Sequence, residues 1–355
     1  MPQKMCFNSL RKSADNPTFR PLIIPIFIPH AGCPHQCVFC NQRAITSIDA
    51  RIPSRTDIVQ FVESFLRYSH VKRYPVEIAF YGGNFLGLSP GMINHLLDAV
   101  RPFIDQKRVQ YLRCSTRPDT ISPETLDRLA RFPFTVIEIG VQSMDDSVLA
   151  LSQRGHTAQS SRDAILLVKA GGYRVGAQLM SGLPGDSATG AFTTASRVAD
   201  IGPDFVRIYP TVVLRGSLLE KWFEEGRYSP LTLERAIEQV KSMLRVFQCK
   251  QIPVIRMGLQ PTESLLRSDE ILAGPFHPAF GHLVVASHFK DMARDILDRW
   301  TSTSSSIQIH VNSRNESNIR GQKNETIHYL KRRYQIRHID VILDNSLSAD
   351  DIQIT

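Results

Sequence analysis

The sequence has no run of 18 or more apolar residues, although 42% of its 355 residues are hydrophobic. A membrane-spanning helix needs about 20 consecutive apolar residues, so we expect no membrane partner. The amino-terminal segment also lacks the apolar stretch of a secretory signal, and a polar lead-in is expected over residues 1–19. Together these absences predict a cytoplasmic protein.

Cysteine is scarce and unevenly placed. Of the six cysteines, Cys33, Cys37 and Cys40 are clustered and the other three are scattered along the chain. This is not the spread of a disulfide framework, and in a reducing compartment a tight cysteine cluster indicates metal or redox chemistry. The formal net charge of +8 is compatible with an anionic partner such as RNA.

Apolar runs alternate with helical patterns between residues 20 and 250. This alternation predicts an α/β fold with a parallel sheet, as a partial (β/α)6 TIM-like barrel or an open doubly wound sheet. Functional residues then belong on the loops that follow the strands. The predicted strands are 22–29, 76–81, 109–116, 136–141, 174–180 and 205–209, and the predicted helices are 57–68, 89–104, 123–131, 157–170, 191–201 and 232–246.

The remaining chain divides by composition. Residues 20–250 are expected to form the core barrel, with an extension of this core over residues 251–300. The polar stretch 301–306 reads as a linker. A small basic α+β module is expected over residues 307–355.

The three clustered cysteines follow the first predicted strand in a C-x3-C-x2-C loop. Thiolates this close can face one centre. Structural zinc requires a fourth ligand, and His35 lies on the same short loop while no second CxxC or HxxxH motif follows downstream. An iron–sulfur cluster held by three thiolates leaves one iron open to another ligand. A zinc-binding scaffold without enzymatic activity and unligated thiols remain the alternatives.

This loop, with Phe39 before its last cysteine, resembles the radical S-adenosylmethionine (SAM) signature. The resemblance implies a [4Fe–4S] cluster held by Cys33, Cys37 and Cys40, with SAM chelating the unique iron. It also implies that one electron, from an external donor of flavodoxin or ferredoxin type, cleaves SAM to a 5′-deoxyadenosyl radical that abstracts hydrogen from a substrate.

Further motifs resemble the SAM pocket of that family. Gly82, Gly83 and Asn84 follow the second strand like the GGE element that receives the SAM amino group, and paired glycines allow a close approach to the backbone. Asn84 stands where many relatives carry Glu or Thr, so its contact with SAM is expected to come from the backbone alone. Ser115 stands where close relatives carry Glu before a TRPD stretch, and Cys114 reads as a small buried hydrophobe.

The fourth strand ends in a GVQS element like that of oxygen-independent coproporphyrinogen oxidases, which implies that Gln142 binds the SAM ribose. Arg154 aligns with the arginine that binds the SAM carboxylate, a role that suits a guanidinium fork. The resemblance also places Gln178 toward the adenosyl ribose. The alternatives are a solvated helix-terminal charge for Arg154 and a satisfied barrel-interior amide for Gln178.

Among radical SAM families, the chain most resembles the Elongator-type group. That group's catalytic subunit has a longer spacing between its first two cysteines and a carboxy-terminal acetyltransferase domain, so we expect a short relative without acetyl-transfer chemistry. A tRNA substrate and a small-molecule metabolite are the two expectations. The matching stretches are PHAGCPHQCVFCNQ, FYGGNF, STRPD, IEIGVQS, RGHT, SGLPG and RIYPTVVLRGSLLEKWFEEGRY.

Residues beyond position 207 are candidates for the substrate side, and each has a bland alternative as a core aromatic, a surface charge or a loop turn. They are Tyr209, Arg215, Arg256, Gln260 and His277.

The basic module faintly resembles a KH module, in which a GxxG loop between helices holds a nucleic-acid backbone. Between residues 314 and 337 there are seven Lys or Arg against two Glu, and Asn324 replaces the second glycine. A solvated face on a small capping module is the alternative. The candidate nucleic-acid contacts are Arg320, Gly321, Lys323, Lys331, Arg332 and Arg333.

Overall fold

The computed structural model describes residues 21–28, 30–42, 44, 52–68, 73–260, 265, 270–300 and 304–355. The predicted lead-in over residues 1–19 lies outside the described residues, as do positions 301–303 of the predicted linker. None of the described helices is long and apolar enough to cross a membrane.

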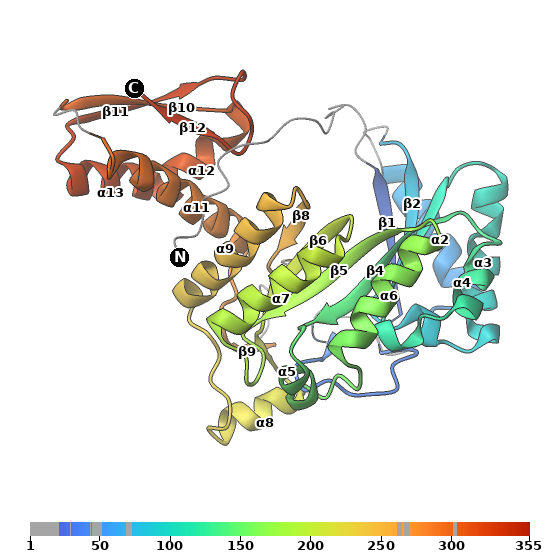
Figure 1. Cartoon of the computed structure of the whole chain (residues 1–355). Helices are drawn as coiled ribbons and strands as arrows, with labels where there is room; N and C mark the ends of the chain where they lie inside the picture. Colours follow the sequence, from blue (N-terminus) through green and yellow to red (C-terminus); the bar gives the residue numbers. More distant parts are fainter. Residues whose placement is uncertain are drawn as a thin grey trace.

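A seven-stranded parallel sheet, in the order β1-β2-β3-β4-β5-β6-β8, curls into a half barrel (Figure 1). This confirms the predicted α/β partial barrel and adds one strand. The seventh strand pairs with β6 beyond residue 250, so the sheet continues past the predicted end of the core. The strands are β1 (Leu22–Phe27), β2 (Val76–Tyr81), β3 (Tyr111–Thr116), β4 (Phe134–Gln142), β5 (Arg174–Ser181), β6 (Phe205–Pro210) and β8 (Val254–Met257).

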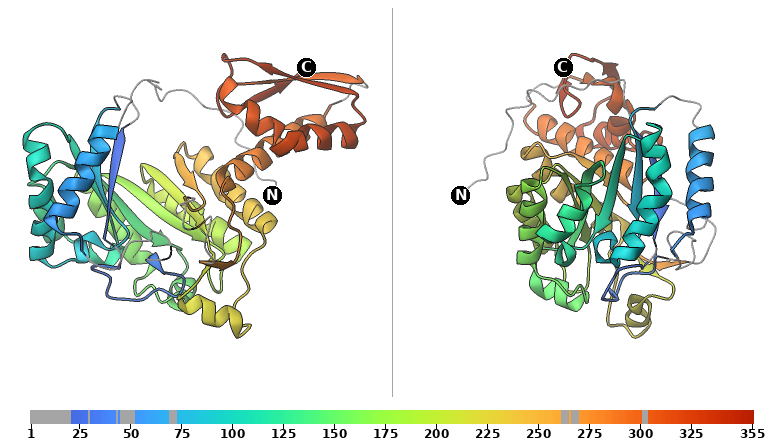
Figure 2. Two further views of the ribbon diagram at one scale, coloured as in Figure 1. Left: turned by 180° about the vertical axis from the view of Figure 1, so that it is seen from behind. Right: turned by 90° about the vertical axis from the view of Figure 1, so that its right-hand side faces the viewer.

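Helices cover the outside of the curl (Figures 1 and 2). Several begin at a hydroxyl cap, in which a Ser or Thr side chain accepts a backbone N–H of the first turn; Ser89, Thr157, Ser187 and Thr232 do so. The helices are α2 (Arg55–Tyr68), α3 (Pro90–Asp105), α4 (Pro123–Leu129), α5 (Asp146–Leu151), α6 (Ala158–Ala170), α7 (Ala188–Ile201) and α9 (Leu233–Cys249).

The two faces of the sheet differ in chemistry. Side chains alternate along a strand, and those facing the helices are fully buried apolar residues, such as Val206 and Ile208 on β6. The alternate positions, Arg207 and Tyr209, therefore face the inside of the curl. The hydrophobic core lies between sheet and helices, which leaves the inner face free to carry polar side chains.

Two smaller units complete the chain. Strands β7 (Val213–Leu214) and β9 (Ile271–Ala273) pair antiparallel, and α8 (Leu218–Glu224) follows β7. The carboxy-terminal unit is a three-stranded sheet in the order β11-β10-β12 with helices on one side (Figure 1). Its elements are β10 (Ser306–Val311), α12 (Glu316–Arg320), α13 (Glu325–Tyr334), β11 (His338–Leu343) and β12 (Ile352–Ile354).

Helix α11 (Phe280–Leu297) joins this unit to the barrel. Its first turns supply Phe280 and Val284 to the barrel core, and its later turns supply Phe289 and Leu297 to the core of the carboxy-terminal unit. The core of that unit therefore begins upstream of residue 307, where the composition had placed its start.

Candidate functional site

The cysteine loop lies beyond the carboxyl end of β1, at the edge where the motifs after the other strands meet. Cys37 is buried, whereas Cys33 and Cys40 are half-buried. Within the loop, the backbone N–H of Cys40 donates to the carbonyl of Cys37 over 3.0 Å. Cys114 lies elsewhere, fully buried in the hydrophobic core, in agreement with its interpretation as a small hydrophobe.

The glycine pair after β2 fits closely against the cysteine loop. Gly82 has a φ of +83°, and a Cβ on Gly83 would lie 2.4 Å from the carbonyl oxygen of Ile28. Only glycine allows this approach. The turn thus brings the segment after β2 against the backbone that leads into the cysteines.

The side chain of Asn84 is engaged within the protein, which is compatible with a contact to SAM through the backbone alone. It is fully buried, and its amide nitrogen donates to the carbonyl of Gly32 over 2.7 Å. Its amide oxygen accepts from the hydroxyls of Thr116 and Thr120 and from the backbone N–H of Arg117, at 2.7–3.0 Å. The side chain therefore fastens the cysteine loop to the end of β3.

Arg154 connects the cysteine loop to β4. Its Nη1 donates to the sulfur of Cys37 over 3.1 Å, and its Nη2 donates to the carbonyl of Gly140 over 2.6 Å. Arg117 in turn donates to the backbone carbonyl of Arg154 and forms a bidentate ion pair with Asp119. The guanidinium predicted to bind a carboxylate is thus held beside the cysteines.

Gln142 and Gln178 lie next to each other. The Nε2 of Gln178 is 3.4 Å from the Oε1 of Gln142, and the register shifts in the β4–β5 pairing between Gly140 and Gln142. Gln142 has a φ of +68°, which is uncommon for a residue with a side chain and marks a locally strained backbone. The bulge turns this side chain toward Gly140, where Arg154 also binds.

Burial is the main cause of the pKa shifts of the metal-free thiols. It raises the pKa of Cys40 to about 12, with the neighbouring Cys37 and Cys33 thiols acting in the same direction. Burial, followed by Cys37, also raises the pKa of Cys33. A metal centre stabilises thiolates, so metal binding here is coupled to proton release. Three thiols on one loop, with an arginine donating to one of them, fit a cluster held by three thiolates.

Within the described ranges of the chain, no three His, Cys, Asp or Glu side chains converge as ligands of a single metal ion.

Comparisons with known proteins match this geometry. The radical SAM superfamily matches residues 27–189, and the radical SAM carboxy-terminal domain matches residues 203–290. Protein MJ0486 of Methanocaldococcus jannaschii is 30% identical over 225 residues, which cover 60% of this chain and 68% of that protein. The chain belongs to the radical SAM superfamily. It is therefore an enzyme of this superfamily.

The Elongator-type resemblance also stands. A tRNA uridine(34) acetyltransferase of Dehalococcoides mccartyi is 29% identical over 247 residues, which cover 60% of this chain and 54% of that protein. The fold matches the Elp3 structure of Methanocaldococcus infernus with a TM-score of 0.59 and 21% identity, over 78% of this chain and 63% of that one. The chain spans about half the length of the acetyltransferases that it matches.

Radical SAM residues predicted from the sequence are only partly brought together. Phe39 packs against a small hydrophobic cluster that includes Val213 and Leu219. Ser115 is half-buried on β3, opposite Glu138 of β4. The remaining cofactor candidates, Gly82, Gly83, Gln142, Arg154 and Gln178, gather around the cysteine loop and the end of β4.

The substrate candidates do not form one group. Tyr209 and Arg256 lie on the inner face, each next to Arg207. The backbone carbonyl of Arg215 accepts from the side chain of Asn41 beside the cysteine loop. Gln260 is exposed, and the ring of His277 accepts the backbone N–H of Ala279, as expected of a loop turn.

The inner face carries an ion-pair network that sequence reasoning missed. Glu138 receives Nη2 of Arg113 at 2.8 Å and the hydroxyl of Tyr81 at 2.7 Å. The Nε of Arg207 lies 2.7 Å from Glu138, close enough for an ion pair although its N–H does not point at the oxygen. Arg113 also pairs with Glu77 over 3.1 Å. The sequence signal for this network was the presence of charged residues inside otherwise apolar strands, at positions that alternate with buried apolar ones.

His156 is a second missed residue. It is 8% exposed, and neither ring nitrogen has a hydrogen-bond partner within the described ranges. Burial, followed by the charge of Arg154, lowers its pKa to about 4, so the ring is neutral at neutral pH. It lies two residues after Arg154 and is close enough to feel the charge of that guanidinium.

Basic residues of the carboxy-terminal unit divide into paired and unpaired groups. Arg320 pairs with Glu316 over 3.0 Å, and Arg333 lies 3.5 Å from Asp298 on α11. In the part of the chain that the structure describes, Lys323, Lys331 and Arg332 have no ion pair. The loop between α12 and α13 is left-handed at Gly321, Lys323 and Asn324, in agreement with the tolerance expected of Asn324.

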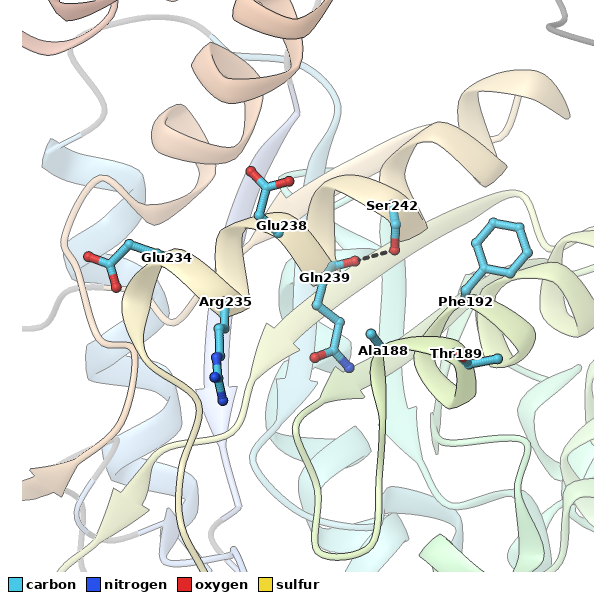
Figure 3. A pocket seen from close by; sticks show the side chains of 8 residues that line it. All are labelled: Ala188, Thr189, Phe192, Glu234, Arg235, Glu238, Gln239 and Ser242. Carbon is cyan, nitrogen blue, oxygen red and sulfur yellow. Dashed lines mark hydrogen bonds between the residues drawn. The ribbon is translucent and has the colours of Figure 1, made fainter.

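A separate pocket of about 700 Å³ lies on the outer helices (Figure 3). Residues of α7 and α9 line it, including Phe192 and Gln239. These helices cover the outside of the sheet, so the pocket is not part of the cysteine site.

Proposed function

We propose that Cys33, Cys37 and Cys40 hold a [4Fe–4S] cluster and that SAM binds beside it. One observation carries this proposal: Arg154 donates to both the Cys37 sulfur and the Gly140 carbonyl, and so joins the thiols to the end of β4, where Gln142 lies beside Gln178 of β5. When bound, the reduced cluster and SAM supply a 5′-deoxyadenosyl radical that abstracts hydrogen from the substrate.

The protein's own groups then have separate tasks in this proposal. Arg154 offers a planar fork for the SAM carboxylate. Gln142 and Gln178 offer amides to the ribose hydroxyls. Gly83 keeps the turn after β2 close to the loop, and Asn84 fixes that turn from behind without contacting the cofactor through its side chain.

Anaerobic reconstitution with iron and sulfide tests the first step. We expect brown protein with a thiolate-to-iron charge-transfer band, and loss of this band in Cys37→Ala. Addition of SAM and a reductant should then yield 5′-deoxyadenosine. Colourless protein that retains one tightly bound zinc ion would overturn the proposal.

We further propose that the substrate is a tRNA. Relatives named tRNA uridine(34) acetyltransferase support this substrate class, and acetyl transfer itself is not proposed for this chain. The unpaired Lys323, Lys331 and Arg332 also support it, because unneutralised cations bind backbone phosphates. In Figures 1 and 2 the carboxy-terminal unit lies at the end of the molecule opposite α8, so a polymeric substrate is suited to contacting both ends.

Filter binding of tRNA at a series of salt concentrations tests this substrate. The triple variant Lys323→Ala, Lys331→Ala, Arg332→Ala should flatten the salt dependence by about two to three units of log–log slope. Its control removes the same charge from exposed positions on α4, its carboxy-terminal loop and α6, with Arg128→Ala, Arg131→Ala and Arg162→Ala. Equal effects of both triples would sink the proposed role of the module.

A small-molecule substrate is the second candidate, favoured by the charged inner face around Glu138. Turnover of a metabolite in the presence of SAM, with deuterium transfer to 5′-deoxyadenosine and no salt-dependent tRNA binding, would decide for it.

A further inference from the structure

A small hydrophobic cluster, separate from the main core, covers part of the cysteine loop. Val38, Val213 and Leu219 are fully buried in it, and Tyr228 is 8% exposed. Val38 and the adjoining Phe39 are the two residues between Cys37 and Cys40. The chain between two of the cysteines is therefore the part that this cluster buries.

The covering segment comprises residues 211–228 together with β9, and we call it the cap. Its β7 strand pairs with β9, and α8 follows immediately. In both Figures 1 and 2, α8 lies at the same end of the barrel as α5. The cap thus sits over the end of the barrel where the cysteine loop emerges.

Three hydrogen bonds hold the cap, two to the cysteine loop and one to the turn after β5. The backbone N–H of Leu219 donates to the carbonyl of Val38 over 2.8 Å. The side chain of Asn41 donates to the carbonyl of Arg215 over 2.6 Å. The hydroxyl of Tyr228 donates to the carbonyl of Gly182 over 2.7 Å, which ties the cap to the turn after β5.

The opposite side of the loop is open. Pro34, His35 and Gln36 are exposed, in contrast to the buried Cys37 and Val38 that follow them. The loop therefore has a covered half, from Cys37 to Asn41, and an uncovered half between the first two cysteines. Packing of this kind determines how often water or dioxygen reaches the covered sulfurs, because small molecules enter mainly through local opening.

We propose that the cap is a shield that keeps water and dioxygen from the iron–sulfur cluster and holds the Cys37–Cys40 segment in place. This inference rests on the proposed function. Solvent exposure is one of the factors that govern the properties of an iron–sulfur cluster, so a shield on the cysteine loop acts on the cofactor without contacting the substrate. Most of the cap belongs to the stretch RIYPTVVLRGSLLEKWFEEGRY, one of the stretches that match the Elongator-type group.

Leu219→Ala tests the shield in the full-length protein, with Leu96→Ala as its control. Both leucines are fully buried, but Leu96 lies on α3 in the main core. In the reconstituted protein, exposure to air should bleach the charge-transfer band about ten-fold faster in Leu219→Ala, because local opening becomes more frequent. The control should bleach at the wild-type rate. Equal acceleration in both variants would contradict a specific shield.

A second measurement uses metal-free protein and does not depend on the cluster. Maleimide labelling, followed by peptide mass spectrometry, should modify Cys37 and Cys40 about ten-fold faster in Leu219→Ala than in wild type. The exposed Cys249 gives an internal reference with an unchanged rate. Unchanged labelling of Cys37 and Cys40 would overturn the shield.

The two measurements separate the inference from the function on which it rests. If wild-type protein forms no iron–sulfur chromophore, the proposed function is contradicted. The maleimide labelling of metal-free protein still tests the packing of the cap in that case. If Leu219→Ala does not fold, Tyr228→Phe carries the test, since it removes only the hydroxyl that reaches Gly182. A roughly three-fold faster labelling of Cys37 and Cys40 is then expected, and an unchanged rate overturns the inference.

Discussion

The barrel edge around the cysteines and the carboxy-terminal module use polar residues in opposite ways. At the barrel edge, Asn84, Arg154 and Glu138 are buried, and each contacts several segments that are far apart in the sequence. In the module, Lys323 and Arg332 are exposed on one contiguous stretch of chain. A buried polar group depends on its partners, whereas an exposed charge interacts mainly with solvent.

This difference predicts how each region responds to substitution. Removal of one buried partner leaves another group unpaired and desolvated, so effects at the barrel edge should be large and cooperative. Removal of one surface charge changes a screened, long-range interaction and should leave folding almost unchanged. Substitutions matched between the two regions therefore test the contrast.

Glu138→Gln should have the largest effect on stability. It leaves Arg113 and Arg207 without their shared carboxylate in the barrel interior, and loss of one partner of a buried ion pair costs about 3–5 kcal/mol. Glu316→Gln, which breaks the exposed pair with Arg320, should cost about 0.5 kcal/mol or less. Urea unfolding of both variants measures the difference. Comparable losses would erase the contrast between the regions.

The main elements of the barrel could be predicted from periodicity, but the 18-residue helix α11 was not among the predicted helices, and its region was expected only as an extension of the core. Its buried residues are divided between two cores. The other exceptions are short. Helices α5 and α8 have six and seven residues, too short for a clear helical period. Strand β8 has four residues, one of them Arg256, and nothing in so short a run distinguishes a strand from a loop. Long apolar strands such as β4 were predicted because both their length and their burial are visible in composition.

The candidate site was predictable where its residues lie in motifs. The cysteine loop, Arg154 and the glutamines were singled out in this way, and their roles stay predictions. The Glu138 network was missed because it depends on strand register and on which face turns inward, and neither is encoded in a short stretch. The contact of Asn84 with SAM was expected through its backbone and stays a prediction, whereas the partners of its side chain, Thr116 and Thr120, lie 32 and 36 positions away and could not be read from the motif.

Asn84→Glu should have the next largest effect. The new carboxylate cannot donate to the carbonyl of Gly32, and it is placed in a fully buried position. We expect a loss of about 2–3 kcal/mol in the free energy of unfolding. Gln322→Glu, the same introduction of charge at an exposed loop position in the module, should cost about 0.5 kcal/mol or less. If Asn84→Glu had the same free energy of unfolding as wild type, the side chain at position 84 would belong to the SAM pocket instead.

His288 tests the seam between α9 and α11, where the two regions join. Arg245 donates to its Nδ1 over 3.2 Å, and Asp291, Lys241 and Asp295 also surround it. Burial, followed by the charge of Arg245, lowers its pKa to about 4 from the ordinary 6.5. The imidazole of His288 therefore binds a proton more readily in the unfolded chain than in the folded protein. The free energy of unfolding is unaffected by this histidine above pH 6.5, and it decreases as the pH falls from 6.5 toward 4.

Wild-type protein should lose about 1 kcal/mol through this histidine between about pH 7.5 and about pH 5.5. His288→Gln should remove that part of the pH dependence, as measured by urea midpoints at both pH values. His156→Gln should remove a similar part, since its pKa is lowered to about the same value. If His288→Gln kept the wild-type pH dependence, the protonated ring of His288 would be accessible to solvent in the folded protein.

The smallest expected effect compares two residues with similar backbones. Lys323 in the module and Gln142 at the end of β4 have φ values of +50° and +68°. Glycine relieves such strain, so Lys323→Gly should raise the free energy of unfolding by about 0.5 kcal/mol, because the exposed side chain contributes little. Gln142→Gly should show no such gain, since it deletes a buried amide beside Gln178 and Gly140, and it should weaken SAM binding measured by calorimetry. If both glycine variants gained the same free energy of unfolding, the contacts of the Gln142 side chain would not be what holds its backbone in the strained conformation. The barrel edge and the module would then differ only in how deeply their polar residues are buried.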